Sequence, residues 1–319
     1  MKFLKQTLLV LSMAAVLFTG CSKDDDDTDI TLGDKNGILL VTFGSSYEAP
    51  QETFKTIGAA TKAKFPGVEI RWAYTAELIL NKLRQGNGEG TLNGQKIDND
   101  NPEEALIQMV KDGYSKITVQ SLHIIPGEEF DDVVGTVEKV KKQFPGLECA
   151  IGKPLLDSPE DLTEVARVLA EKFKAETAAG QPVCLMGHGT PEHVNHNRYA
   201  QLEDELQKLS PLFYIGVVDP NTVLDDEENA PLIDGVLPKI KSLNLKDKKV
   251  TISPLMSIAG DHASNDMNGV TNSAKLDEQS WKERFEGEGY AVTSVMKGLG
   301  DYAEINAIWM KHLEAARIK

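Results

Sequence analysis

The chain is poor in cysteine, in aromatic residues and in basic residues relative to acidic ones. Of its 319 residues three are cysteines and 6% are aromatic, and 34 lysines and arginines face 49 aspartates and glutamates, a net charge of −15. No basic stripe occurs, which argues against nucleic acid as a partner, because phosphate binding needs a basic face. There is no CxxC pair, and we expect the widely spaced Cys149 and Cys184 to be core residues rather than a disulfide.

Motifs for nucleotide and acyl chemistry are also missing. The phosphate-binding pattern GxxxxGK[ST] does not occur, and the glycine-rich segment 86–94 follows a predicted helix instead of a strand. The segment 44–46 (Gly-Ser-Ser) lacks the strand–GxSxG–helix context of a nucleophilic serine. These absences argue against nucleotide-dependent chemistry and serine hydrolysis.

One apolar run near the N-terminus, 8–18, follows Lys2 and Lys5 and ends at a small pair, Thr-Gly, before Cys21. It is too short to span a bilayer, so it predicts a secretory signal at 1–20 rather than a membrane helix. A cysteine directly after small residues resembles a bacterial lipoprotein cleavage site, with Cys21 as the lipidated first residue. Phe18 stands where such sites usually carry leucine.

Four consecutive aspartates at 24–27 follow this site. Such a dense run of like charges predicts an acidic disordered tether over 21–36. The run is either a plain linker or the acidic signal that it resembles, which directs lipoproteins of Bacteroides-like bacteria to the outer face of the outer membrane. We therefore expect an exported, lipid-anchored protein on the periplasmic face or the cell surface, with its membrane contact through Cys21.

From residue 37 onward, short β-branched runs alternate with longer amphipathic stretches, which indicates parallel sheets covered on both faces. The predicted strands are 38–43, 68–74, 117–122, 147–151, 183–187, 213–218, 250–254 and 290–295. The predicted helices are 51–64, 76–84, 102–111, 129–143, 159–174, 197–209, 231–240, 273–285 and 302–316.

The two halves of the chain repeat each other. Phe43 aligns with His188 at an offset of 145, and Glu129 aligns with His262 at an offset of 133. We expect an α/β fold of two similar Rossmann-like domains, 37–155 and 156–319, with the active site in the cleft between them. Open parallel sheets bind ligands beyond the carboxyl ends of their strands, where His188, Asp219 and His262 all fall.

Two imidazoles and a carboxylate form a site for a first-row divalent metal with open coordination positions. His188, between two glycines after a buried strand, has little packing reason to be there. For His262 a solvated helix start is the alternative, and Asp219 before Pro220 is equally well explained as a turn carboxylate. Asp261 is a candidate to orient an imidazole.

The remaining histidines have structural explanations. We expect His123 at a core or cleft wall, and His193, His196 and His312 at the surface. The carboxylates Glu128 and Glu129 start a predicted helix, where the helix dipole favours them regardless of function.

Four segments carry a family likeness: 38–46, 119–129, 187–190 (Gly-His-Gly-Thr) and 259–267. Together they resemble the anaerobic sirohydrochlorin cobalt chelatases of the CbiK type, with colinear motifs from residue 37 to about 311. The resemblance implies a class II chelatase fold and insertion of Co²⁺ into sirohydrochlorin during anaerobic cobalamin synthesis. His188 and His262 match the family's metal-binding histidines and would be catalytic, while Asp219 stands where the family usually has a glutamate ligand.

The resemblance also implies a tetrapyrrole substrate held between the halves, with no organic cofactor. Phe43, Tyr47 and the 86–94 loop would form apolar walls, and His123, Pro126 and Gly127 the opposite wall. A histidine would accept the pyrrole N–H protons. Some exported members of the family look to bind haem as well. Because His123 lies in a matching stretch, haem is a further candidate ligand there.

An exported location conflicts with cytoplasmic cobalamin synthesis. A second hypothesis is therefore a surface or periplasmic lipoprotein that binds haem, another tetrapyrrole or a metal for uptake, or that removes iron from haem. A homo-oligomer is compatible with the sequence. The sequence does not decide whether the physiological metal is Co²⁺ or Fe²⁺.

Overall fold

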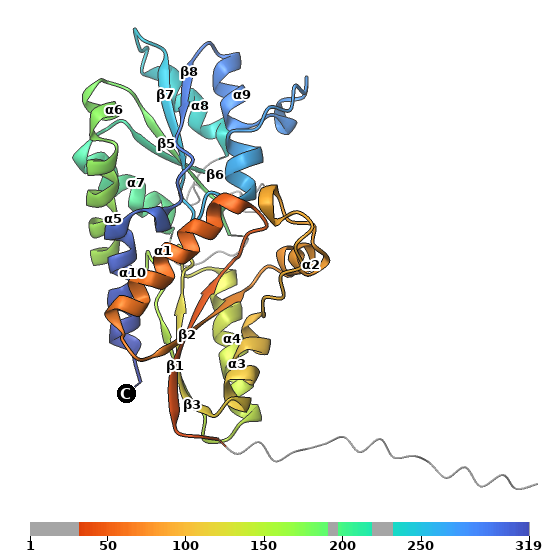
Figure 1. Ribbon diagram of the computed structural model, residues 1–319. Helices are drawn as coiled ribbons and strands as arrows, with labels where there is room; N and C mark the ends of the chain where they lie inside the picture. The colour runs from red at the N-terminus through yellow and green to blue at the C-terminus, as the bar shows by residue number, and fades with distance from the viewer. Residues whose placement is uncertain (1–31, 191–196, 219–231, 319) are drawn as a thin grey trace, which may run out of the picture. The chain divides into compact units, whose positions relative to one another are not determined.

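A computed structural model describes residues 32–190, 197–218 and 232–318 (Figure 1). The first half contains β1 (Lys35–Thr42), α1 (Glu48–Lys64), β2 (Glu69–Tyr74), α2 (Glu77–Gln85), α3 (Pro102–Lys111), β3 (Tyr114–Ser121), α4 (Glu128–Gln143) and β4 (Glu148–Gly152). The second half contains α5 (Pro159–Lys172), α6 (Lys174–Ala178), β5 (Val183–Gly187), α7 (Arg198–Leu209), β6 (Phe213–Val217), α8 (Ile233–Ser242), β7 (Lys249–Pro254), α9 (Trp281–Gly287), β8 (Ala291–Ser294) and α10 (Ala303–Ala316). All the predicted strands are present.

Two parallel four-stranded sheets share one topology. Their strand orders are β2-β1-β3-β4 and β6-β5-β7-β8, so each strand of the first sheet corresponds to the strand four places later in the second. Equivalent hydrogen bonds recur at the offsets read from the sequence. The Leu122 amide donates to the Val41 carbonyl at 2.8 Å, and the Leu255 amide donates to the Met186 carbonyl at 2.7 Å. The predicted duplicated α/β fold is confirmed.

Alternating side chains of the central strands fill the layers on both faces of each sheet. In β5, Leu185 packs in a cluster with residues of α5 and α7, while Met186 packs in another with residues of α8 and α9. The first of these clusters continues into the other sheet through Ile38 of β1 and Trp309 of α10. A single apolar layer thus supports both sheets from one side.

The C-terminal helix belongs with the first sheet. α10 packs against β3 and β4, and it lies beside α1 in Figure 1. His312 of α10, predicted at the surface, is only 10% exposed, because its ring reaches the buried Asp161 carboxylate at the start of α5. The surface prediction for His312 is therefore wrong.

Several boundaries differ from the predictions, and three of them change the extent of the tether or of a helix. Lys35 and Asn36, assigned to the tether, already pair with β3 as the first residues of β1. The predicted helix 273–285 is regular only from Trp281, because Ser280 caps it there with Glu283 in a capping box. The predicted helix 159–174 ends at Lys172, before the separate α6.

The predicted signal, the lipidation site Cys21 and the acidic run lie outside the described residues. Within the described ranges, no helix is both long and apolar enough to cross a membrane. Cys184 is fully buried in β5 and Cys149 partly buried in β4, and both are free thiols, as expected for core residues.

Candidate active site

The loops after β1 and β5 have the same backbone turn but carry different side chains. Gly189 follows His188 with φ +103°, and Gly44 follows Phe43 with φ +93°. These left-handed values suit glycine, which explains the glycine at both turns. The ring of Phe43 lies 6.4 Å from the ring of His188, so the two strand ends face each other.

His262 lies beside His188. It immediately precedes a single-turn π-helix, Ala263–Met267, in the segment after β7, and π-helical turns are frequent at functional sites. The two imidazole rings are 4.9 Å apart between centroids and meet at 72°. The prediction that the two histidines lie close together at the strand ends is therefore confirmed.

Each of these rings meets an oxygen acceptor at Nδ1. His262 Nδ1 lies 2.7 Å from the Asp266 carboxylate, and His188 Nδ1 lies 3.2 Å from the Gly189 carbonyl. An acceptor at this position holds the proton on Nδ1 and so puts the lone pair of the neutral ring on Nε2. Asp261, the expected orienting carboxylate, instead accepts a hydrogen bond from the Tyr47 hydroxyl at 3.0 Å.

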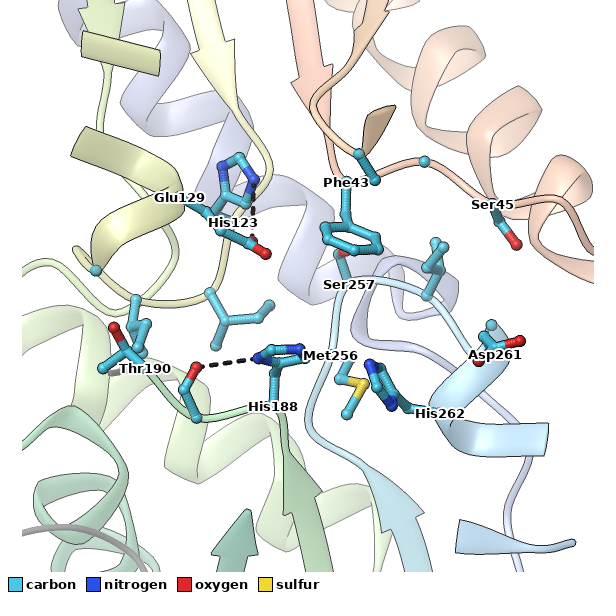
Figure 2. A pocket seen from close by; sticks show the side chains of 18 of the residues that line it. Phe43, Ser45, His123, Glu129, His188, Thr190, Met256, Ser257, Asp261 and His262 are labelled. Carbon is cyan, nitrogen blue, oxygen red and sulfur yellow. Dashed lines mark hydrogen bonds and ion pairs between the residues drawn. The ribbon is translucent and has the colours of Figure 1, made fainter. Parts of the chain in front are cut away.

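A cavity of about 400 Å³ opens at these strand ends, and Figure 2 shows His123 and Glu129 on one wall with His188 and His262 on another. Residues from both halves of the chain line it: Phe43, Gly44, Ser45, Ala76, Leu78, Ile79, Lys82, His123, Ile124, Ile125, Gly127, Glu128, Glu129, Phe130, His188, Gly189, Thr190, Tyr199, Leu255, Met256, Ser257, Ile258, Gly260, Asp261 and His262. Its volume lies within the range of small-molecule sites, about 300–1,000 Å³. The mainly apolar lining with a few polar groups suits an organic ligand with an apolar body and a few polar groups.

His123 and Glu129 form a second polar pair on the first-half wall. His123 Nε2 lies 3.5 Å from the Glu129 carboxylate, and its Nδ1 lies 2.8 Å from the Ser121 hydroxyl. Burial lowers the pKa of His123 to about 4, so its ring is neutral. Burial, helped by the charge of Glu128, raises the pKa of Glu129 to about 7. A carboxyl with that pKa exchanges its proton near neutral pH.

The predicted site residues fall into three groups. Those that line the cavity are Phe43, His123, Gly127, His188 and His262. Tyr47 and Pro126 are not among the lining residues, and neither is any residue of the 86–94 loop, although Tyr47 holds the lining residue Asp261. The third predicted ligand, Asp219, lies outside the described residues.

No cluster of three or more His, Cys, Asp or Glu side chains suited to a metal occurs within the described ranges. Of the three predicted metal ligands, the structure describes His188 and His262. Neutral imidazole nitrogens suit first-row divalent ions such as cobalt, so the residues present fit such an ion.

Sequence reasoning missed the role of two carboxylates. Glu129 was explained by the helix dipole, yet its alignment with His262 across the repeat was the signal that it occupies an equivalent position at the site. Asp266 was not singled out, although its spacing of four from His262 favours a contact within one turn.

Comparison with known proteins extends over nearly the whole chain. The model of the family described as cobalt chelatase (CbiK) matches residues 36–318. The sirohydrochlorin cobaltochelatase CbiKC of Nitratidesulfovibrio vulgaris is 31% identical over 282 residues, which is 88% of this chain and 90% of the relative. The sirohydrochlorin cobaltochelatase of Salmonella typhimurium is 33% identical over 288 residues, covering 88% of this chain and 96% of that protein.

A solved structure supports the fold. SirB from Bacillus subtilis, determined with Fe³⁺, matches with a TM-score of 0.54 at 15% identity, over 89% of this chain and 96% of that one. The family model and the two relatives agree with the colinear motifs and with the histidines brought together at the strand ends. The chain therefore belongs to the cobalt chelatase (CbiK) family.

Proposed function

We propose that the chain is a sirohydrochlorin cobaltochelatase, which inserts Co²⁺ into sirohydrochlorin with release of the pyrrole N–H protons. The observation that carries the proposal is the pair of facing histidines, His188 and His262, each with an oxygen acceptor at Nδ1. The names of the two relatives, each covered over at least 90% of its length, support the same reaction and substrate.

The histidine pair would receive the metal. With protons held on Nδ1, both rings offer the Nε2 lone pair as ligand, the arrangement found where a carboxylate or carbonyl orients a metal-binding histidine. Asp219 is the predicted third ligand. An open set of this kind delivers its ion to the macrocycle nitrogens more readily than a closed cage, because positions remain for the incoming ligand.

The proton acceptor is better assigned to Glu129 than to a histidine. Once Nε2 of His188 or His262 binds Co²⁺, that nitrogen has no lone pair left for a proton. Glu129 lines the same cavity, and its pKa of about 7 lets the carboxylate take a proton and return it to solvent. The neutral His123 lies beside it, with Nε2 3.5 Å from the carboxylate and Nδ1 2.8 Å from the Ser121 hydroxyl.

The chain also has the sequence signals of an exported lipoprotein. The apolar run 8–18, the small residues after it and Cys21 support cleavage before Cys21 and lipidation there. The four aspartates at 24–27 support a tether between the lipid and the folded part, whose first strand begins at Lys35. The enzyme would then act on the periplasmic face or at the cell surface.

The test of the activity is Co²⁺ insertion into sirohydrochlorin, followed by the absorbance change of the macrocycle. We expect turnover by the parent and none by His188→Ala or His262→Ala, while thermal unfolding shows that both variants fold. If the parent binds sirohydrochlorin or haem tightly but inserts no cobalt, the enzyme is excluded and a tetrapyrrole-binding lipoprotein takes its place.

The test of the anchor is independent of activity. Labelled fatty acid should be incorporated into the parent and into the control Cys149→Ala, and not into Cys21→Ala, which should leave the membrane fraction. Equal labelling of Cys21→Ala and the parent would exclude this lipidation site.

A further inference from the structure

One helix at the cavity has features that the metal site and the proton acceptor do not explain. α2 contributes Leu78 and Lys82 to the lining, and this i, i+4 spacing puts both on one face of the helix. Leu78 is 69% exposed, which is among the largest exposures of an apolar side chain in the described residues. An exposed leucine at the rim of an apolar cavity suggests a surface that a ligand covers.

Lys82 is the basic residue of this cavity. It is half-buried, and no ion pair or side-chain hydrogen bond joins its ammonium to another described residue. Arg84, two residues further on, is by contrast held by Asp98 at 3.2 Å and by Glu104 at 2.6 Å. The helix therefore keeps one cation engaged in the fold and presents the other to the cavity.

The other charged side chains of the lining are acidic. Glu128 and Glu129 lie at the start of α4, and Asp261 lies beside His262. Among the described lining residues Lys82 is the one lysine or arginine. A ligand with anionic groups is therefore repelled from the α4 and His262 sides and attracted to α2.

We propose that Leu78 and Lys82 form a rim subsite that binds one of the peripheral carboxylates of the macrocycle, at the edge of the ring that lies against α2. The inference rests on the proposed function, because sirohydrochlorin combines an apolar ring with acetate and propionate side chains at its periphery. Leu78 packs against the ring. Lys82, which lies one helical turn after Leu78, pairs with a carboxylate of the ligand. The apolar surroundings strengthen that pair relative to one fully in water.

The experiment measures steady-state cobalt insertion with sirohydrochlorin by the full chain and by Lys82→Glu. Charge reversal should raise the KM for sirohydrochlorin roughly fivefold or more, since a partly buried ion pair contributes about 1 kcal/mol and is replaced by repulsion. The KM for Co²⁺ should stay within about twofold, because the histidines are untouched. Added salt should raise the parent's KM for sirohydrochlorin, because it screens the attraction to Lys82, and should lower that of Lys82→Glu, because it screens the repulsion.

Two further variants keep the result interpretable. Lys82→Arg keeps the charge and should restore a KM near that of the parent. Lys111→Glu makes the same charge change at the end of α3, near the amino end of β3, whereas the cavity lies at the carboxyl ends of the strands. This control should leave the KM unchanged.

Failure of the inference differs from failure of the proposed function. If the parent inserts cobalt and Lys82→Glu has the parent's KM for sirohydrochlorin, the rim subsite is excluded and the chelatase remains. If Lys82→Glu does not fold, Lys82→Gln is measured instead, and a KM equal to that of the parent excludes the subsite. A parent without insertion activity overturns the proposed function; the rim subsite is then judged by fluorescence titration with metal-free sirohydrochlorin, where equal affinities of the parent and Lys82→Glu exclude it.

Discussion

The imidazole of His262 hydrogen-bonds through Nδ1 to the Asp266 carboxylate at 2.7 Å, one helical turn further along the chain. The adjacent Asp261 instead accepts hydrogen bonds from Tyr47 and Asn265. Two neighbouring carboxylates therefore have different tasks. One orients a candidate metal ligand, and the other joins the loop after β1 to the loop after β7.

This division predicts different metal affinities for two matched variants. Asp266→Ala should weaken Co²⁺ binding by about 10- to 100-fold, because the ring of His262 loses the acceptor that orients it and raises its basicity. Asp261→Ala should change the affinity by less than about threefold. Calorimetric titration of the metal-free protein with Co²⁺, without macrocycle, measures both. Equal losses in the two variants would contradict the assignment.

Glu129 predicts a pH dependence of the reaction. Because the pKa of Glu129 is raised to about 7, insertion by the parent should accelerate as the pH rises through 7, where the carboxylate becomes available. Glu129→Gln should insert cobalt at least about 100-fold more slowly and without that rise, while it still binds sirohydrochlorin. Rates from pH 5.5 to 8.5, with binding followed by fluorescence, separate the two effects.

Unfolding gives a second readout for Glu129. An acid whose pKa is higher in the folded protein than in the unfolded chain binds its proton mainly in the folded state between those values, so it lowers stability as the pH rises from about 4.5 to 7. Glu129→Gln should therefore gain stability relative to the parent over that range. A constant difference at all pH values would contradict the raised pKa.

The fold and the histidine pair of the site could be predicted from the sequence, whereas the role of Glu129 could not. The positions of His188 and His262 could be predicted, because each follows a buried apolar run that forms a strand and each lies at a glycine-containing turn. The role of Glu129 was hidden because a carboxylate at a helix start has a sufficient local explanation. Its partial burial depends on the cavity at the start of α4, which only the packing of both halves creates.

His312 illustrates the same limit in the core. Nothing in the amphipathic pattern of 302–316 distinguishes it from an exposed histidine. Its partner Asp161 lies 151 positions earlier in the chain, in the first turn of a helix. The helix cap alone explains an acidic residue at that position, so the sequence gives no sign of the histidine. Pairings of such separation need the tertiary structure.

The buried His123 predicts an acid-sensitive stability. Its pKa is lowered from its usual value, 6.5, to about 4 in the folded protein, so the unfolded chain binds a proton there that the folded state does not. Stability should fall as the pH drops through 6.5, by about 2 kcal/mol between pH 7.5 and 5 for this group alone. His123→Gln should lose correspondingly less over that interval in urea unfolding. A variant with the same pH dependence as the parent would show that folding does not lower the pKa of His123.

The contact between His312 and Asp161 predicts how firmly α10 is held to the rest of the chain. His312 Nε2 lies 3.0 Å from Asp161 Oδ1, and the two side chains are 10% and 5% exposed. His312→Ala should lower the free energy of unfolding by about 1–3 kcal/mol, because it removes a buried partner from a carboxylate that keeps only its Ser158 contacts. Lys311, the neighbouring residue of α10, makes an exposed ion pair with Glu164 of α5, and Lys311→Ala should lower the free energy of unfolding by less than about 1 kcal/mol. Urea unfolding with an unchanged m-value measures both, and a larger effect of Lys311→Ala would show that surface pairing, rather than the buried contact, holds α10 in place.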